Sequence, residues 1–127
     1  MIFGIGTDIV EYLRIEKMFA RYGVRFAERI LSERELPELG GHVDQARFLA
    51  KRFAAKEAFA KAVGSGLRHP VSLRRIGVVH DGLGKPALQF DETLRTYLAQ
   101  LGINGHHVSI SDERDFIVAF VVLETGV

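Results

Sequence analysis

The stretch Phe53–Gly66, FAAKEAFAKAVGSG, decides the fold of this chain. It is expected to form the second half of a helix that ends in a glycine-rich turn, because Gly64 stands where a helix C-terminus favours a residue that tolerates positive φ. Glu57 and Lys61 are four residues apart and so project from one face of that helix. A carboxylate, an ammonium and a turn of small residues suit a metal ion with a phosphate. For this stretch alone, a surface ion pair between Glu57 and Lys61 is the more ordinary interpretation.

Upstream of this stretch, the helix is expected to begin after Asp44, which can cap it, and to run to about Val63. Its apolar residues cover more than one side, which is typical of a central, well-buried helix. They include Phe48, Leu49, Phe53, Phe59 and Val63.

The N-terminus, MIFGIGTDIVEYLRIEK, predicts a buried strand over residues 2–8 with Asp8 near its end. An acidic residue in an apolar strand is costly to bury unless it is paired or bound to a metal ion. Asp8 could instead cap the helix that is expected to start near Glu11, a role that aspartate performs well. Local signals leave these two interpretations open.

The remaining segments follow no regular alternation of helix and strand. The expected helices cover residues 11–22, 26–31 and 91–101, with a capping-box pattern at Ser32 and Glu35, and the expected strands cover residues 76–80, 87–90, 107–111 and 116–123. This order predicts an α+β fold, an antiparallel sheet wrapped on one long helix. Because the run FIVAFVVL is apolar in both phases, both faces of the last strand should be covered.

Composition limits the possible classes of protein. The 127 residues are 47% hydrophobic and suit one domain spanning residues 1–127. The absence of cysteine excludes a disulfide framework and fits a cytoplasmic protein. No apolar run approaches the roughly 18–20 residues of a membrane span, and no signal peptide is evident. The net charge is only +1, with basic residues concentrated in residues 12–26 and 47–61, which indicates local anionic partners rather than nucleic acid or a membrane.

Five segments, in order, resemble the holo-acyl-carrier-protein synthases, the short bacterial 4′-phosphopantetheinyl transferases. They are GIGTDIVEYLRIEK near the start, RFAERIL from Arg25, RFAAKEAFAKAVGSG from Arg52, GKP from Gly84 and HVSISDE from His107. The resemblance implies that the chain transfers 4′-phosphopantetheine from coenzyme A to a serine of apo-acyl carrier protein, releases 3′,5′-ADP and supports fatty acid biosynthesis. It also implies the fold of that family and a homotrimer whose active sites lie between subunits.

The resemblance assigns roles to three residues at the reacting centre. Asp8 and Glu57 would bind Mg²⁺, a cation that proteins hold with one or two carboxylates plus substrate phosphates. Lys61 would reach the diphosphate and stabilise the leaving group. The serine proton would go to Glu57 or to a water on the metal, and the water is preferred because a carboxylate bound to Mg²⁺ is a poor base.

Coenzyme A also carries phosphates and an adenine that need partners. By resemblance, Arg52, Ser65 and Gly66 are candidates for the phosphates, Lys85 and Pro86 for the nucleotide, and His107 for adenine or phosphate. The plainer interpretations are a simple turn at GKP and a histidine at the edge of the core.

The first expected helix carries a basic face. Arg14, Arg21 and Arg25 fall at i, i+7 and i+11 if the helix continues through Gly23. Met18 lies among them and Phe26 just beyond, so the face combines an apolar anchor with charges that would steer an acidic carrier protein. The same residues match the family's carrier-binding helix. The alternative is a solvated face with Met18 in the core.

Two other classes of protein compete with the enzyme. A module that binds coenzyme A without transfer would not need both acidic residues. A nucleic-acid-binding protein usually carries a larger excess of positive charge or aromatic residues interleaved with basic ones.

Overall fold

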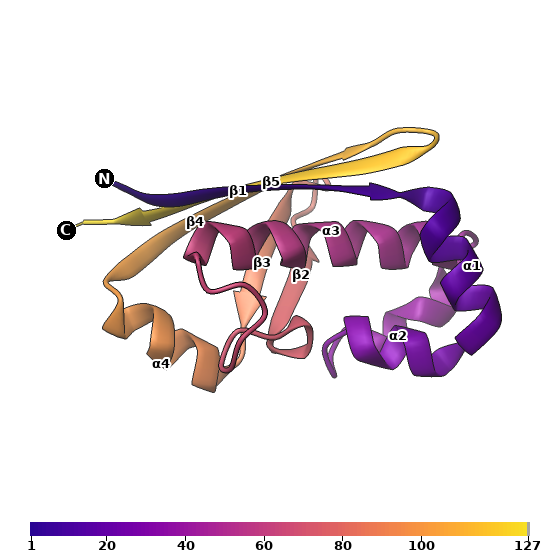
Figure 1. Ribbon diagram of the computed structural model, residues 1–127, viewed down its shortest axis with the longest axis horizontal. Coiled ribbons are helices and arrows are strands. Elements are labelled where there is room, and N and C mark those ends of the chain that lie inside the picture. Colours follow the sequence, from indigo (N-terminus) through magenta and orange to yellow (C-terminus); the bar gives the residue numbers. More distant parts are fainter. Residues whose placement is uncertain (127) are drawn as a thin grey trace.

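The computed structural model describes residues 1–126 and shows an α+β fold built on one long helix, α3 (Gln45–Val63). A three-stranded antiparallel sheet lies across one side of α3, as Figure 1 shows. Its strands are β1 (Ile2–Glu11), β5 (Phe116–Thr125) and β4 (Ile103–Asp112), in the order β1-β5-β4. The predicted fold class is confirmed, and all three strands are longer than the sequence suggested.

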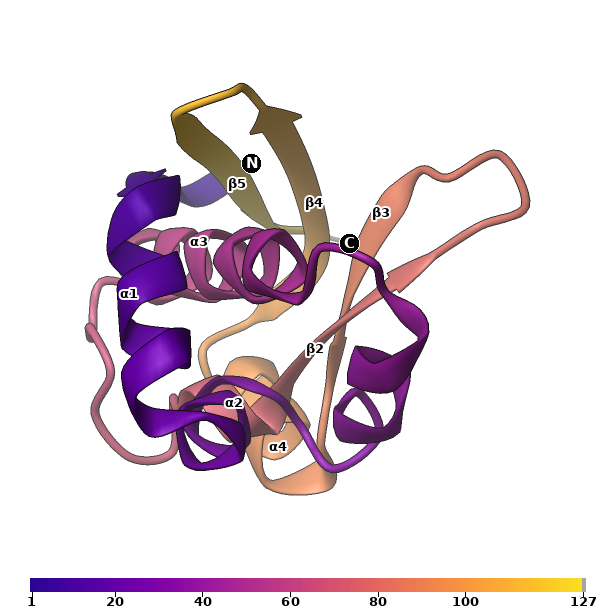
Figure 2. The ribbon, with the colours of Figure 1, turned by 90° about the vertical axis from the view of Figure 1, so that its right-hand side faces the viewer.

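A second, two-stranded sheet replaces part of the single sheet that was expected. β2 (Ile76–His80) pairs with β3 (Pro86–Phe90), and the helix α4 (Glu92–Gln100) follows. β3 lies beside β4 but is not hydrogen-bonded to it, so the sheet that wraps α3 is in two parts. The loop that joins β2 and β3 projects away from the body of the molecule (Figure 2).

The segment between β1 and α3 forms two helices and a short 3-10 helix. α1 (Tyr12–Tyr22) ends at Gly23, whose φ of 59° lies in the left-handed region, and α2 (Val24–Ile30) begins directly after it. The basic face is therefore divided between two helices and does not continue along one. The predicted capping box is present, since Ser32 N donates to Glu35 Oε1 and Glu35 N donates to Ser32 Oγ. It leads into the 3-10 helix η1 (Leu36–Gly41).

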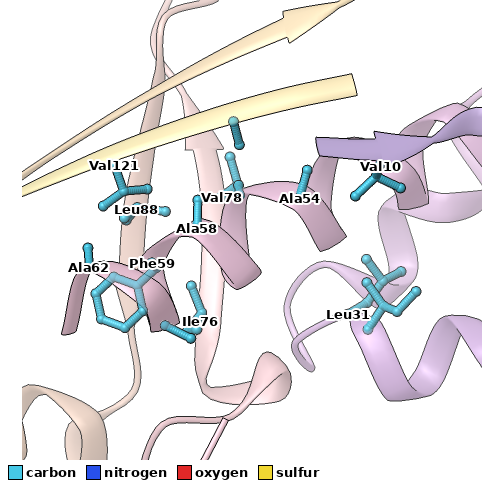
Figure 3. Close-up of a cluster of buried hydrophobic side chains, with 14 of the residues drawn as sticks. Val10, Leu31, Ala54, Ala58, Phe59, Ala62, Ile76, Val78, Leu88 and Val121 are labelled. Atoms are coloured by element: carbon cyan, nitrogen blue, oxygen red, sulfur yellow. The ribbon is translucent and has the colours of Figure 1, made fainter. Parts of the chain in front are cut away.

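The two ends of α3 are set by local sequence, as predicted. Asp44 accepts a hydrogen bond from Arg47 N at the start, and Gly64, with a φ of 92°, ends the helix. Between them α3 is buried on nearly every side. Its face toward β1 is made of alanines, and its opposite face presents Phe59 to β2 and β3 (Figure 3).

The strand β1 packs on α3 backbone against backbone. A Cβ atom built on Gly6 would lie 2.0 Å from Ala58 O, and one built on Gly4 would lie 2.0 Å from Ala62 O. Only glycine fits at either position. Asp8 and Val10 are the next two residues in this phase of the strand, so this close approach directs the Asp8 side chain toward α3.

The other face of the three-stranded sheet is open to solvent in the single chain. We define the outer sheet face by its large exposed apolar residues, Phe3, Ile5, Ile9, Phe116 and Phe120, which are 38–63% exposed. They lie together because Ile5 pairs with Val122 and Ile9 pairs with Val118 of β5. The expectation that β1 is buried and that both faces of β5 are covered is therefore wrong for one chain alone.

Within residues 1–126, no helix is both long and apolar enough to span a bilayer.

Candidate active site

The Asp8 side chain lies beside the place where β1 passes over α3 in backbone contact, which we call the β1–α3 crossing. Asp8 pairs with Ala119 of β5 and lies on the inward phase of β1, three residues before the end of the strand. The residue at the N-cap of α1 is Glu11, and no side chain caps that end. The interpretation of Asp8 as a helix cap is therefore wrong.

Lys61 bonds across the crossing to β1. Its Nζ donates to Asp8 Oδ1 at 3.1 Å and to Thr7 O at 3.0 Å. In the part of the chain that the structure describes, Lys61 has no ion pair with Glu57, so the predicted alternative of a simple surface pair along the helix is not formed. The Asp8 side chain is only 15% exposed, whereas that of Lys61 is 54% exposed and its ammonium is open to a ligand.

Glu57 faces the same space. Burial raises the pKa of Glu57, the negative charge of Asp8 raises it further, and the positive charge of Lys61 opposes both effects. Glu57 therefore lies within the electrostatic field of Asp8, and the Lys61 ammonium supplies positive charge beside them. Two carboxylates held together favour a bound cation, since a cation removes their mutual repulsion.

The donor set at the crossing fits a hard cation that also takes substrate oxygens. Among residues 1–126, no group of three or more metal-binding side chains forms a complete cage. Mg²⁺ is commonly held by only one or two carboxylates, with phosphate oxygens and waters completing its shell. Asp8 and Glu57 supply that number of ligands.

The glycine turn lies at the same end of α3 as Lys61. Gly64 and Gly66 both have positive φ, and Ser65 Oγ donates to Gly66 O at 2.8 Å. The turn is exposed apart from the partly buried Ser65, so a phosphate could approach it from solvent.

Four other candidate residues lie elsewhere in the chain. Arg52 is buried, with its Nε 3.0 Å from Glu35 Oε2 and its guanidinium over the ring of Phe48. Lys85 and Pro86 belong to the β2–β3 hairpin, and His107 lies on the outer phase of β4, where its Nε2 is 2.6 Å from Glu124 Oε1. Among the described residues, no hydrogen bond or ion pair connects these four to the Asp8–Glu57–Lys61 group.

Comparison with known proteins decides the family. The sequence pattern of the 4′-phosphopantetheinyl transferase superfamily matches residues 4–121. This chain belongs to that superfamily. Holo-[acyl-carrier-protein] synthase of Nitrosospira multiformis is 56% identical over 124 residues, which cover 98% of this chain and 99% of that protein.

Two solved structures of superfamily members match the fold over nearly their whole length. The crystal structure of the holo-[acyl-carrier-protein] synthase of Neisseria meningitidis has a TM-score of 0.96 at 50% identity, covering 98% of this chain and all of that one. The corresponding synthase of Bacillus anthracis, solved in complex with CoA (3′,5′-ADP), has a TM-score of 0.83 at 43% identity, covering 99% of each chain.

In this phosphopantetheinyl transferase, α1 and α2 enclose a groove of about 610 Å³. It is lined by Met18, Tyr22, Arg25, Phe26, Glu28 and Arg29. Met18 is 38% exposed and lines the groove, so it is not a core residue. Arg14 and Arg21 are exposed on α1 but do not line the groove.

Sequence reasoning missed two features of this transferase. Tyr22 and Arg29 line the groove, and the four-residue spacing of Arg25 and Arg29 on one helix was a usable signal. It also missed a buried ionic cluster around Glu35, in which burial lowers the pKa of Lys56 to about 8.

Proposed function

We propose that this transferase moves the 4′-phosphopantetheine group of coenzyme A to a serine of apo-acyl carrier protein. The serine oxygen forms a bond to the phosphorus that carries pantetheine, the diphosphate bond breaks, and 3′,5′-ADP leaves as the serine passes its proton to Glu57 or to a water. The meeting of Asp8, Glu57 and Lys61 at the β1–α3 crossing carries this proposal. The whole-chain similarity to synthases, including one solved with CoA (3′,5′-ADP), supports it, and the product would supply fatty acid biosynthesis.

Lys61 is suited to stabilise the negative charge that develops on the leaving group in this reaction. An ammonium has three donors, and Lys61 uses two of them on Thr7 O and Asp8 Oδ1. The third donor is available to the diphosphate of coenzyme A, where negative charge grows as the bond to 3′,5′-ADP breaks. Because β1 holds Lys61 in place before substrate arrives, little reorganisation is needed during the reaction.

Mg²⁺ fits the same crossing, and Asp8 and Glu57 would hold it. The ion would supply positive charge to the phosphate oxygens of coenzyme A. Two features support this assignment. The number and type of ligands match what Mg²⁺ uses with phosphate substrates, and the negative charge of Asp8 raises the pKa of Glu57.

The remaining coenzyme A contacts would come from more than one subunit. Ser65 and Gly66 would bind phosphates, Lys85 and Pro86 the nucleotide, and His107 the adenine or a phosphate. The phosphate role expected for Arg52 is not kept, because its guanidinium is buried and lies against Glu35 and Phe48. His107 lies on the outer phase of the sheet, away from the side that packs on α3, so it serves a neighbouring subunit more readily than its own crossing. We also propose a cytoplasmic location, which a chain without cysteine fits.

Mass spectrometry of apo-carrier protein tests the proposed function. Carrier mixed with the transferase, coenzyme A and Mg²⁺ should gain the mass of one phosphopantetheine group, while a mixture without coenzyme A should gain nothing. If the protein binds coenzyme A but the carrier mass never changes, the chain is a binding module. A panel of several apo-carriers run in the same way would show which are accepted.

A homotrimer would cover the outer sheet face. Contiguous apolar surface of this kind usually marks a protein interface. We expect the wild type to sediment as a trimer, and Phe120→Lys, which puts a charge at the centre of the face, to sediment as a monomer and lose most transfer activity. Val43→Lys is the matched control, since Val43 is an apolar residue that is fully exposed elsewhere. A fully active monomer at assay concentration would contradict the shared site.

Carrier docking is proposed for the basic α1–α2 surface, around Arg14, Met18, Arg21, Arg25 and Phe26. Exposed charges at the edge of an interface mainly change the rate of association. Arg14→Glu and Arg21→Glu should therefore raise KM for carrier protein about tenfold or more and leave KM for coenzyme A within about twofold. Added salt should weaken wild-type carrier binding through the same attraction.

Arg74→Glu is the control for charge reversal, since Arg74 is exposed on the 3-10 turn η2 (Leu73–Arg75) and does not line the groove. Steady-state kinetics with each substrate varied in turn makes the measurement. Equal damage to both KM values, or none to that of the carrier, would place the docking surface elsewhere.

A further inference from the structure

A lysine without any contact with solvent lies directly beside Glu57 on α3. Lys56 is 0% exposed, and its Nζ donates to Glu35 Oε1 and to Ile30 O, both at 2.6 Å. Ile30 is the last residue of α2, so its carbonyl is one that the helix itself leaves without a partner. The Lys56 side chain therefore bonds the C-terminus of α2 to the middle of α3, in addition to the packing of Ala27 and Ile30 in the core.

Glu35 holds the other end of this connection. Its Oε1 also accepts from Ser32 N, and its Oε2 accepts from Val78 N of β2 at 2.8 Å. Arg52, one helical turn before Lys56, lies with its Nε 3.0 Å from Glu35 Oε2. Two cations thus share one buried carboxylate, and Glu35 keeps a balancing positive charge even when Lys56 is removed.

Stability alone does not account for a charge in this place. Buried ion pairs often contribute no more than well-packed apolar residues of similar volume, because desolvation offsets their attraction. A methionine of about the same length would fill the volume that Lys56 occupies. The property that an apolar residue cannot reproduce is the directed bond to Ile30 O.

The bond between Lys56 Nζ and Ile30 O connects the helix that would bind the carrier with the helix that carries the proposed metal site. α2 carries Arg25 and Phe26 of the proposed docking groove, and the residue after Lys56 is Glu57 of the proposed metal site. A helix with its side chains is roughly 10–12 Å across, so a rotation of about 10° moves a side-chain tip by about 1 Å. A misplacement of about 1 Å can cost about 100-fold in rate.

We propose that Lys56 is a positioning residue: by bonding Ile30 O it sets α2, which holds the carrier, at the correct distance from the group on α3 that acts on the carrier's serine. The inference rests on the proposed function. It assigns Lys56 no contact with coenzyme A, metal or serine. Its loss therefore leaves each substrate bound and separates the two reacting atoms.

The test compares Lys56→Met with Glu35→Gln. Lys56→Met removes the bond to Ile30 O and leaves the Glu35–Arg52 pair balanced. Glu35→Gln keeps an acceptor for Lys56 and the bond to Ile30 O, but it removes the only buried anion of the cluster and should be the less stable of the two. Arg75→Met is the control, because it breaks a different ion pair, that with Asp91, and leaves the bond between Lys56 Nζ and Ile30 O in place.

Turnover is measured per coenzyme A site counted by calorimetry, so that unfolded protein does not enter the rate. We expect Lys56→Met to lose 10-fold to 100-fold in kcat, with KM for the carrier and the dissociation constant of coenzyme A within about threefold of wild type. Glu35→Gln, despite its lower melting temperature, should keep kcat within about threefold. Lys56→Met would then be the more stable variant but the less active one, whereas Glu35→Gln would be less stable but nearly as active as wild type.

Several results would overturn the inference. They are an unchanged kcat in Lys56→Met, a fall in kcat that coenzyme A binding matches, a fall in Glu35→Gln as large as that in Lys56→Met, and failure of Lys56→Met to fold, which would make the lysine a plain structural requirement. If wild type itself transfers nothing, the proposed function fails first, so the two failures are distinguishable.

Discussion

Replacing Asp8 or Glu57 by alanine should reduce transfer by at least about three orders of magnitude while the fold stays intact. Both residues lie at the edge of the β1–α3 crossing, and neither is part of the buried apolar cluster. Each change removes one of the two negative charges that would hold Mg²⁺, so the phosphates of coenzyme A would lose their counter-charge. The rate of mass gain by the carrier measures the loss, and circular dichroism checks the fold.

The isosteric variants Asp8→Asn and Glu57→Gln sharpen this test. They keep the size of the side chain and, at Asp8, an acceptor for Lys61, so their loss reports charge rather than packing. Each should need a higher Mg²⁺ concentration to reach half its maximal rate. Glu33→Gln, which neutralises an exposed carboxylate, is the control. Full activity of either alanine variant, or full wild-type activity in excess chelator, would refute the two-carboxylate site.

Lys61→Ala should lower kcat by about 100-fold or more, the scale for losing one preorganised donor at a developing charge. Its effect on coenzyme A binding should be smaller, because the ground-state diphosphate carries less charge toward the leaving group. Lys61→Arg should recover part of the rate, since it keeps the charge with a different geometry. Single-turnover kinetics with saturating coenzyme A separates the two effects. A near-normal kcat would make Lys61 only a support for β1.

The sequence predicts α3 well because its signals are local. Asp44 and Gly64 fix its ends through bonds and backbone angles that involve only their neighbours. The pairing of Asp8 with Glu57 was not accessible in that way, since 49 positions separate them and only the family resemblance suggested that they meet. The structure brings Asp8 close enough to raise the pKa of Glu57.

The errors have physical causes. An apolar residue is equally apolar whether it is covered by its own chain or by a neighbouring copy, so the pattern of β1 and β5 predicted burial that a single chain does not provide. The division of the sheet depends on how β3 and β4 approach each other, which no local signal records.

The cluster around Glu35 was missed for a different reason. Lysine is seldom buried, so Lys56 was not considered as a core residue. Its helical phase was informative, because Phe59 and Val63 lie three and seven positions further on, on the same buried face.

The contact of β1 with α3 at Gly4 and Gly6 also limits how this protein can be altered. A new carrier specificity can be sought by varying α1 and α2, whose exposed side chains face no such restriction. The two glycines allow no such search, because any larger residue pushes the strand from the helix and moves Asp8 away from Glu57. A randomised library selected for activity should return many residue types at Val43 and only glycine at Gly4 and Gly6. Sequence variation is therefore excluded at the two positions that hold Asp8 against α3.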